Sequence, residues 1–316
     1  MKLNHIKAII VSSVTLAVAL GLAPSSAQAD YVYVSNYGNN TIEKFSSTGA
    51  DLGVFASAHL NGPMGLAIDS SGNIYAANYL NSTITKYDSS GAYQGVFASD
   101  NVNKPEGLAF DSSGNLYVAD NGNNSITKYD SSGTYLSTFA THLNGPWGLA
   151  LDNSGNVYVE KTGNNTIEKF SSSGTDLGVF ASAHLSGPLG LAIDSSGNVY
   201  AANRNVDTIT EYNSSGAYQG ALPSNSLNAP IGLAFDSSGN LFAVNLGDNT
   251  ISEYNSSDSP LGVFASTGLD EPVFIAIGSG GGSGPVSAVP EPSVFGLWGL
   301  GALVAGGYAW RKKMRT

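Results

Sequence analysis

Residues 63–104 read PMGLAIDSSGNIYAANYLNSTITKYDSSGAYQGVFASDNVNK, and this stretch decides the fold. It contains four short apolar or β-branched segments, which are GLAI, NIYAA, TITKY and YQGVFA. Asp69-Ser-Ser-Gly-Asn separates the first two segments, and Asp88-Ser-Ser-Gly separates the last two. Aspartate can accept bonds from nearby backbone amides and glycine adopts positive φ, so both motifs are typical of tight turns between antiparallel strands. The unit therefore predicts a four-stranded antiparallel sheet.

The same unit returns along the chain at a fixed period. Its first proline recurs at intervals of 42, 41, 42, 42 and 42 residues, at Pro63, Pro105, Pro146, Pro188, Pro230 and Pro272. A fixed period of this length indicates a repeat architecture, and four strands per repeat is typical of a propeller blade.

The two ends of the repeat region complement each other. Tyr31-Val-Tyr-Val aligns with the second strand of a unit, and residues 272–277 align with the first strand but lack the turn that follows it elsewhere. An open solenoid would not need complementary fragments at its ends. We therefore predict an all-β, six-bladed propeller over residues 30–278, with four antiparallel strands per blade. N-terminal strands that pair with the C-terminal strand close the ring.

Composition narrows the classes of function. Charged residues make up 12% of the chain, against about 25% in typical proteins, and the formal net charge is −11. The basic residues at the two ends leave the body more acidic still, without a basic stripe, which disfavours nucleic-acid binding. The chain has no cysteine, which excludes disulfides, thiolate catalysis and cysteine-based zinc sites.

Both ends of the chain have the pattern of targeting segments. Residues 1–29 combine a basic start, an apolar stretch and Ala27-Gln-Ala, which predicts a secretory signal peptide, with a buried N-terminal helix as the alternative. Residues 279–288 form a Gly/Ser-rich linker. The apolar run 294–310 predicts a transmembrane helix, and the basic residues 311–313 that follow should stay cytoplasmic.

A short motif stands before this apolar run. Pro290, Glu291 and Pro292 are followed by a Gly-rich apolar segment and a basic tip. In this order the segment 289–316 resembles the PEP-CTERM sorting signal of Gram-negative bacteria. The resemblance implies recognition by exosortase-type sorting machinery and removal of the tail. An inner-membrane-anchored precursor would then reach the cell surface or a biofilm matrix, while an ordinary C-terminal anchor is the alternative.

The repeat itself also resembles a known family. The phrase P-x-G-L-A-x-D-x-S-G-N-x-Y, nearly intact in five units, is similar to the NHL repeat. The resemblance implies a non-catalytic binding module, for a glycan, a peptide or a matrix polymer such as an exopolysaccharide, or for a surface protein. Related gluconolactonase-like and streptogramin-lyase-like propellers are metal-dependent enzymes, so calcium or magnesium is expected only under that alternative. A structural protein of a biofilm matrix is the third possibility.

Strand order places the connections between units and the loops after the second strands on one variable face, called the loop face below. The DSSGN aspartates belong to the opposite, uniform face, and we interpret them as turn caps because a calcium loop needs several carboxylates. The charged position near the end of each third strand predicts a solvated rim, at Lys44, Lys86, Lys128, Lys169, Glu211 and Glu253. His59, His142 and His184 share one register and are weak candidates for metal ligands; polar loop residues are the favoured interpretation.

Residues that break the repeat are the best candidates for ligand binding. Glu106 and Trp147 depart from the apolar theme directly after the prolines. Glu160 stands in place of a small or apolar residue, and Lys161 in place of Asn or Asp. Arg204 is the only arginine between the end segments. Tryptophan offers a flat apolar face and the charges offer directional hydrogen bonds. We predict a binding groove around these five residues, with drift of surface loops as the alternative.

Overall fold

The computed structural model describes residues 30–224 and 226–279. The predicted signal peptide (1–29) and the segment 280–316 lie outside the described residues. The predictions for residues 1–29, for Pro290, Glu291 and Pro292 and for the helix 294–310 therefore stay predictions. Among the described residues there is no helix with the length and apolar character needed to cross a membrane.

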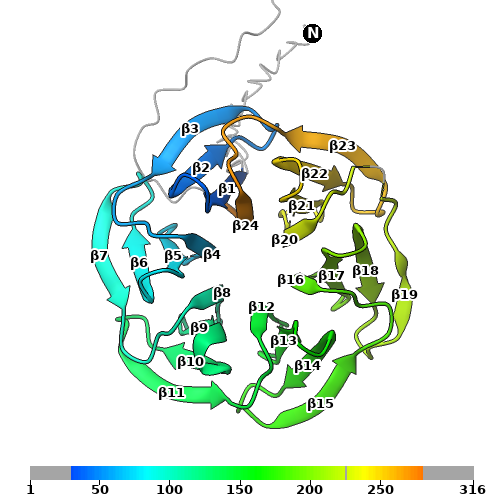
Figure 1. The fold of residues 1–316 in the computed structure, drawn as a ribbon, viewed down its shortest axis with the longest axis horizontal. Coiled ribbons are helices and arrows are strands. Elements are labelled where there is room, and N and C mark those ends of the chain that lie inside the picture. Colours follow the sequence, from blue (N-terminus) through cyan, green and yellow to red (C-terminus); the bar gives the residue numbers. More distant parts are fainter. Residues whose placement is uncertain (1–29, 225, 280–316) are drawn as a thin grey trace, which may run out of the picture. The chain divides into compact units, whose positions relative to one another are not determined.

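The described residues form six four-stranded sheets arranged around a common centre, which confirms the predicted six-bladed propeller (Figure 1). Each blade runs from an inner strand at the axis to an outer strand on the circumference. Blade 1 contains β4 (Pro63–Ile68), β5 (Ile74–Asn78), β6 (Thr83–Tyr87) and β7 (Tyr93–Ala98). Blade 2 contains β8 (Pro105–Phe110), β9 (Leu116–Asp120), β10 (Ser125–Tyr129) and β11 (Tyr135–Ala140), with a short 3-10 turn η1 (Asn121–Asn123).

The remaining blades repeat this order. Blade 3 contains β12 (Pro146–Leu151), β13 (Val157–Lys161), β14 (Thr166–Phe170) and β15 (Asp176–Ala181). Blade 4 contains β16 (Pro188–Ile193), β17 (Val199–Asn203), β18 (Thr208–Tyr212) and β19 (Tyr218–Ala221). Blade 5 contains β20 (Pro230–Phe235), β21 (Leu241–Asn245), β22 (Thr250–Tyr254) and β23 (Pro260–Ala265). Blade 6 combines β24 (Pro272–Ser279) with β1 (Asp30–Asn36), β2 (Thr41–Phe45) and β3 (Asp51–Ala56).

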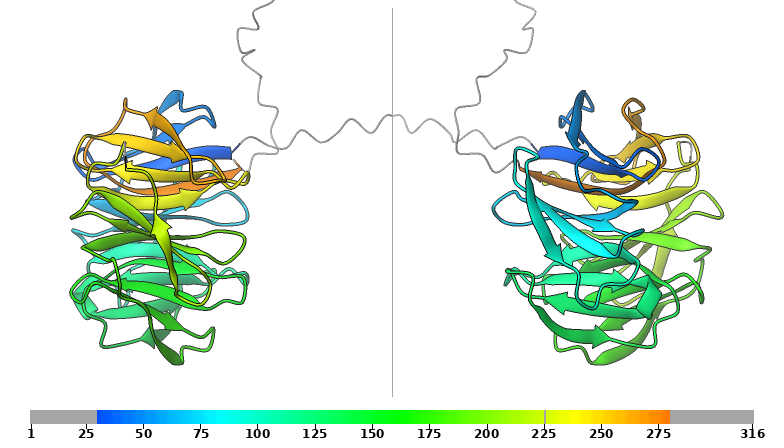
Figure 2. Two further views of the ribbon diagram at one scale, coloured as in Figure 1. Left: turned by 90° about the vertical axis from the view of Figure 1, so that its right-hand side faces the viewer. Right: turned by 60° about the vertical axis from the view of Figure 1, so that its left-hand side comes forward.

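Blade 6 joins the two ends of the propeller. β24 pairs antiparallel with β1, and Val32 lies opposite Ile277 while Val34 lies opposite Ile275. The backbone N–H of Tyr37 extends the pairing with a 3.0 Å bond to the carbonyl of Glu271. The ring is thus closed by hydrogen bonds between residues far apart in the sequence, and Figure 2 shows the blades edge-on.

Glycine allows the inner strands to approach the axis closely. An added Cβ on Gly65 would lie 2.1 Å from the carbonyl oxygen of Glu106, and one on Gly107 would lie 2.6 Å from that of Trp147. Contacts this short do not occur with real side chains, so only glycine fits between neighbouring inner strands. This explains the glycine of the repeated P-x-G motif, and it fixes the residue before each glycine near the axis.

The DSSGN aspartates cap their turns, as predicted. Asp69 Oδ1 accepts bonds of 2.9 Å from the backbone N–H groups of Ser71 and Asn73, and its Oδ2 accepts a 2.7 Å bond from the Asn73 side chain. The same set of bonds recurs at Asp111, Asp152, Asp194 and Asp236. These bonds hold the pKa of Asp69 below its ordinary value despite the opposing effect of burial.

The prediction of a solvated rim at the charged position of the third strands is wrong. The side chain of Lys128 is only 19% exposed, lies 3.1 Å from the Asp111 carboxylate and donates a 2.6 Å bond to the Tyr117 hydroxyl. Long lysine stems can bury their apolar part while the ammonium group meets a partner. Lys128 therefore connects the third strand to the turn aspartate of the same blade. Lys86 and Lys169 do the same with Asp69 and Asp152.

Candidate functional site

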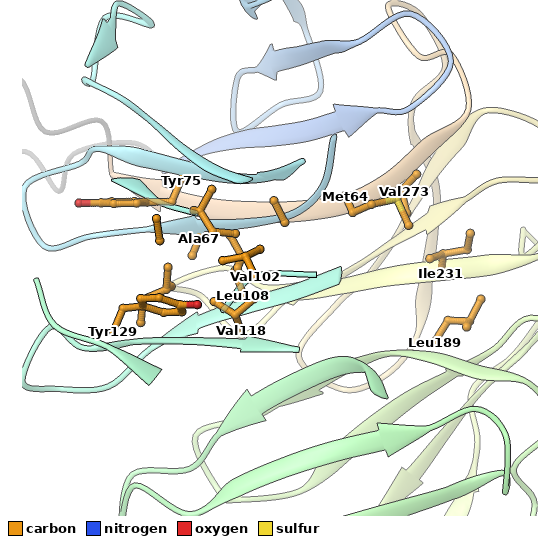
Figure 3. Packing of buried hydrophobic residues seen from close by; sticks show 14 residues of the cluster. Met64, Ala67, Tyr75, Val102, Leu108, Val118, Tyr129, Leu189, Ile231 and Val273 are labelled. Atoms are coloured by element: carbon orange, nitrogen blue, oxygen red, sulfur yellow. The ribbon is translucent and has the colours of Figure 1, made fainter. Parts of the chain in front are cut away.

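The residue after each repeat proline lies near the axis of the ring. Met64, Leu189, Ile231 and Val273 belong to one buried cluster, and the close-up places their side chains near one another (Figure 3). Trp147 is partly buried and packs against this cluster. Glu106 is the single charged member of the six post-proline positions. The inner strands thus present an apolar ring interrupted by one carboxyl group.

A pocket of about 510 Å³ opens beside this ring. Its apolar wall combines post-proline side chains, Trp147 among them, with Leu246, and its polar positions are Arg204, Asn249 and Glu271 together with Tyr37. Tyr37, Arg204 and Leu246 each follow the last residue of a second strand, in β1, β17 and β21 respectively. The pocket therefore lies on the loop face, where the sequence varies between units.

Trp147 supplies the largest flat surface of this pocket. It is the second residue of β12, and its ring centroid lies 5.5 Å from that of Phe274 with an angle of 33° between the planes. Phe274 in turn is fixed by a 3.0 Å bond from its backbone N–H to the Ser35 hydroxyl. An indole held in this way can stack against the apolar face of a sugar or another ring.

Glu106 is buried beside this indole. It is only 3% exposed, and its Oε2 has no hydrogen-bond partner among the described residues. Burial raises the pKa of Glu106 to about 8, although the nearby Trp147 side chain and the charge of Lys104 act in the opposite direction. At neutral pH the group is therefore mostly an uncharged acid that interacts with Trp147.

Glu160 does not reach this pocket. It was expected in the loop after the second strand, but it is the penultimate residue of β13 and its side chain is fully buried between blades. Among the residues that the structure describes, neither carboxyl oxygen of Glu160 has a hydrogen-bond partner. Burial raises the pKa of Glu160 well above its ordinary value, an effect that the backbone N–H of Gly148 partly offsets.

Lys161 also lies outside the central pocket. As the last residue of β13 it forms an ion pair with Glu168 of β14, and both side chains are largely buried. The pair lines a separate pocket of about 420 Å³ that His142 and Asp176 also line. Of the five predicted residues, Trp147 and Arg204 thus share the central pocket, Glu106 lies against Trp147, and Glu160 and Lys161 lie elsewhere.

Three polar residues of the pocket were not predicted from the sequence, namely Tyr37, Asn249 and Glu271. A signal for Tyr37 was present, because the position after the second-strand Asn, Asp or Lys varies more than its neighbours. This register is occupied by Tyr37, Tyr79, Asn121, Thr162, Arg204 and Leu246. Of these six residues only Arg204 was predicted, because it is a cation in an otherwise acidic part of the chain.

The histidines occupy separate blade edges. His59 stacks on Tyr93 with ring centroids 3.8 Å apart, and His184 stacks on Tyr218 at 4.0 Å. His142 Nδ1 lies 2.9 Å from the Thr141 hydroxyl. Within residues 30–224 and 226–279, no three His, Cys, Asp or Glu side chains form a group suited to hold a metal ion.

Comparisons with known proteins agree with this architecture. The NHL repeat model matches residues 102–129 and 143–170. A search of curated protein sequences gave no significant match. A chain from a crystal structure of a nidogen/laminin complex superposes with a TM-score of 0.70 at 18% identity, and the match covers 78% of this chain and 98% of that chain.

Two further solved structures are similar at lower TM-scores. A streptogramin B lyase matches with a TM-score of 0.54 and 18% identity, covering 73% of this chain and 72% of that one. A virginiamycin B lyase from Staphylococcus aureus matches with a TM-score of 0.53 and 16% identity, covering 63% and 68%. At these identities the likeness shows the fold alone. The protein is a six-bladed β-propeller, and two stretches of it match the NHL repeat model.

Proposed function

We propose that this propeller is a non-catalytic binding module that holds a saccharide segment of a surface or matrix polymer in the central pocket of its loop face. The observation that carries the proposal is the pocket of about 510 Å³ in which Trp147 and Tyr37 lie beside Arg204, Asn249 and Glu271. Apolar and aromatic walls with a few polar groups are typical of ligand sites. The volume suits a short oligosaccharide segment.

The chemistry of the lining favours a sugar over a purely apolar ligand. Sugar rings present C–H faces that stack on an indole, and their hydroxyl groups exchange hydrogen bonds with charged and amide side chains. Arg204 can donate several bonds, while Glu271 and Asn249 can accept them. A peptide could use the same groups, so peptides serve as a competing probe in the test below.

The targeting segments support an extracellular place of action. A signal peptide at residues 1–29 and a sorting segment at 289–316 would carry the propeller through the inner membrane to the cell surface or an exopolysaccharide matrix. Recognition of Pro290, Glu291 and Pro292 by an exosortase-type machinery belongs to the same proposal. A matrix polysaccharide is then the partner nearest to the exported protein.

The test is a binding screen with the full chain against defined oligosaccharides, such as cellohexaose, the N-acetylglucosamine hexamer and an alginate hexamer, and against a peptide library. We expect saturable binding of one oligosaccharide class. Trp147→Ala should weaken it by about 1–3 kcal/mol, the usual range for a central aromatic anchor.

The matched control is Ser131→Ala in the Asp130 turn of the opposite face, which should bind like the parent. Binding of peptides alone would replace the saccharide by a protein partner. Turnover of a lactone or streptogramin substrate together with stoichiometric calcium or magnesium would favour the enzyme alternative. No discrete ligand in any arm would favour a structural role in a matrix.

A further inference from the structure

Two buried acids lie on either side of the segment Trp147-Gly148 in β12. Glu106 comes from β8 of the preceding blade and interacts with the Trp147 side chain. Glu160 comes from β13 of the same blade and interacts with the backbone N–H of Gly148. Both acids are at least nine-tenths buried. No other blade has a glutamate at either position, since the equivalent residues are apolar or small.

The ladder bonds of the sheet skip this segment, as they skip the equivalent residues of blades 1, 2 and 5. β12 pairs with β13 at Pro146 opposite Lys161 and again at Leu149 opposite Val159, with a shift of register between them. Trp147 and Gly148 lie in that shift, so ladder bonds to β13 do not fix them. An added Cβ on Gly148 would lie 2.6 Å from Glu160 Oε2, which places this carboxyl directly over the glycine.

The charged and titratable surroundings of the two acids are sparse. Lys104, on the connection before β8, is the cation that acts on Glu106, and its Nζ lies 5.7 Å from the ring centroid of Tyr79. The group that senses the charge of Glu160 is Tyr212 of β18. Lys161, next in sequence to Glu160, is engaged by Glu168. Among the described residues, neither acid therefore forms an ion pair that would stabilise its charged form.

We propose that Glu106 and Glu160, in their uncharged form, are positioning residues that hold Trp147-Gly148 in the ligand-binding arrangement, and that ionisation of Glu106 releases the indole and lowers affinity for the saccharide. The predicted loss of affinity rests on the proposed function, whereas the release of Trp147 can be observed without any ligand. It makes the central pocket a site whose occupancy depends on pH.

The direction of the effect follows from burial. A carboxylate without a counterion is costly in an apolar ring, so the charged Glu106 must reach water. The pocket that offers water is the one that Trp147 lines. The indole must then move aside, and the neutral fraction of Glu106 decreases about tenfold for each pH unit above its pKa.

The experiment uses the full chain with Trp298→Phe and Trp310→Phe, which leaves Trp147 as the one tryptophan. Emission and acrylamide quenching of Trp147 are followed from about pH 5 to pH 9.5, a range that spans the titration of a raised glutamate pKa. We expect a transition centred near the pKa of about 8 for Glu106, with easier quenching on the alkaline side.

Conservative and disruptive variants separate positioning from general stability. Glu106→Gln keeps an uncharged acceptor for the indole, so quenching should stay low and the transition should disappear. Glu106→Leu removes the acceptor, so Trp147 should be easily quenched at every pH. Exchange of the Gly148 amide with solvent should accelerate in Glu160→Ala and stay near the parent rate in Glu160→Gln. Glu43→Gln removes another acid with a raised pKa, which lies outside this pocket. It should leave the Trp147 transition unchanged.

A transition that persists in Glu106→Gln, or its absence from the parent protein, would overturn the proposal. For the saccharide identified in the binding screen, affinity should decrease above about pH 8 in the parent and not in Glu106→Gln. Pocket binding that depends on Trp147 but not on pH would retain the proposed function and contradict this inference alone.

Discussion

Blade 6 and blade 3 contain almost the same twenty residues but stabilise them differently. Residues 41–60 and 166–185 are identical except at Thr48 and Ala50, which correspond to Ser173 and Thr175. In both blades the segment forms the third and fourth strands, β2 and β3 in one and β14 and β15 in the other. The difference lies in the second strand, which pairs with the third and ends at Asn36 in blade 6 and at Lys161 in blade 3.

That one residue changes the surroundings of a glutamate on the third strand. In blade 3, Lys161 forms an ion pair with Glu168. In blade 6, Asn36 offers no cation, and burial together with Asp51 raises the pKa of the corresponding Glu43 to about 7. The same local sequence therefore places the glutamate at the same position in both blades, while its electrostatic surroundings depend on a residue from the neighbouring strand.

The largest expected effect concerns how the two blades are built. Blade 3 is continuous in sequence, whereas blade 6 needs β24 from the other end of the ring. Deletion of residues 272–278 removes this inner strand and leaves β1 with an unpaired edge. We expect loss of cooperative thermal unfolding, measured by calorimetry and circular dichroism. A truncated protein that melts cooperatively at the parent temperature would contradict the role of β24 in ring closure.

The ion pair of blade 3 provides the next test. Lys161→Asn creates the arrangement of blade 6 and leaves the buried Glu168 without its cation, at a cost of about 3 kcal/mol in the free energy of unfolding. Lys161→Asn combined with Glu168→Thr creates the Asn/Thr pair of blade 1, where Asn78 donates a 3.0 Å bond to Thr85. Chemical denaturation should show that the double variant recovers most of the loss. Equal losses in both variants would mean that the pair is not coupled.

The pH dependence of stability tests the arrangement of blade 6. The folded-state pKa of Glu43, about 7, exceeds its ordinary value of 4.5, so the folded protein binds this proton more tightly than the unfolded chain. Stability from this group is full below its unfolded pKa and decreases as pH rises from about 4.5 to 7. Denaturation of the parent should therefore show lower stability at pH 8 than at pH 5.

Two substitutions isolate the contribution of Glu43. Glu43→Gln removes the titrating group, and Asn36→Lys introduces the cation of blade 3, so both should reduce the loss of stability across this range. The raised pKa values of Glu106 and Asp120 leave a residual slope of the same sign in either variant. A slope identical to the parent in both variants would exclude Glu43 as a contributor.

The smallest loss of stability is expected at a contact that the two blades share, which is a histidine stacked on a tyrosine. His59 and His184 stand at the ends of the two shared segments, and each stacks on a tyrosine of the following blade. Replacement of either histidine by alanine should cost about 0.5–1.5 kcal/mol, the range for an aromatic pair. Thermal melting should give similar shifts for both. A shift that appears only after addition of a divalent metal would instead indicate metal binding.

The fold could be predicted almost completely from the sequence because each blade repeats one set of turns and strands. Local backbone geometry explains the DSSGN turns, the glycine after each post-proline residue and the complementary ends. The charged position of the third strand was wrongly predicted to be a solvated rim. Its partner, the turn aspartate, is distant in sequence, and lysine can bury the apolar part of its side chain. Local periodicity does not contain that information.

The candidate site was only partly accessible to the same reasoning. Trp147 and Arg204 could be selected as breaks in the repeat, and they line one pocket. Glu160 broke the repeat as visibly, but alternation along β13 directs its side chain between blades. Glu271 precedes the partial repeat and enters the pocket because the ring closes there. A break in a repeat thus identifies an unusual residue without indicating which face it occupies.

The pocket beside Trp147 is proposed to bind a saccharide. The most direct test uses the full chain with Trp298→Phe and Trp310→Phe. This protein is titrated with the oligosaccharide from the binding screen, and binding is followed by Trp147 fluorescence and by calorimetry in parallel. We predict that both signals saturate at the same ligand concentration and that Trp147→Ala weakens the calorimetric affinity by about 1–3 kcal/mol. Calorimetric binding that leaves Trp147 fluorescence unchanged and persists in Trp147→Ala would contradict the claim.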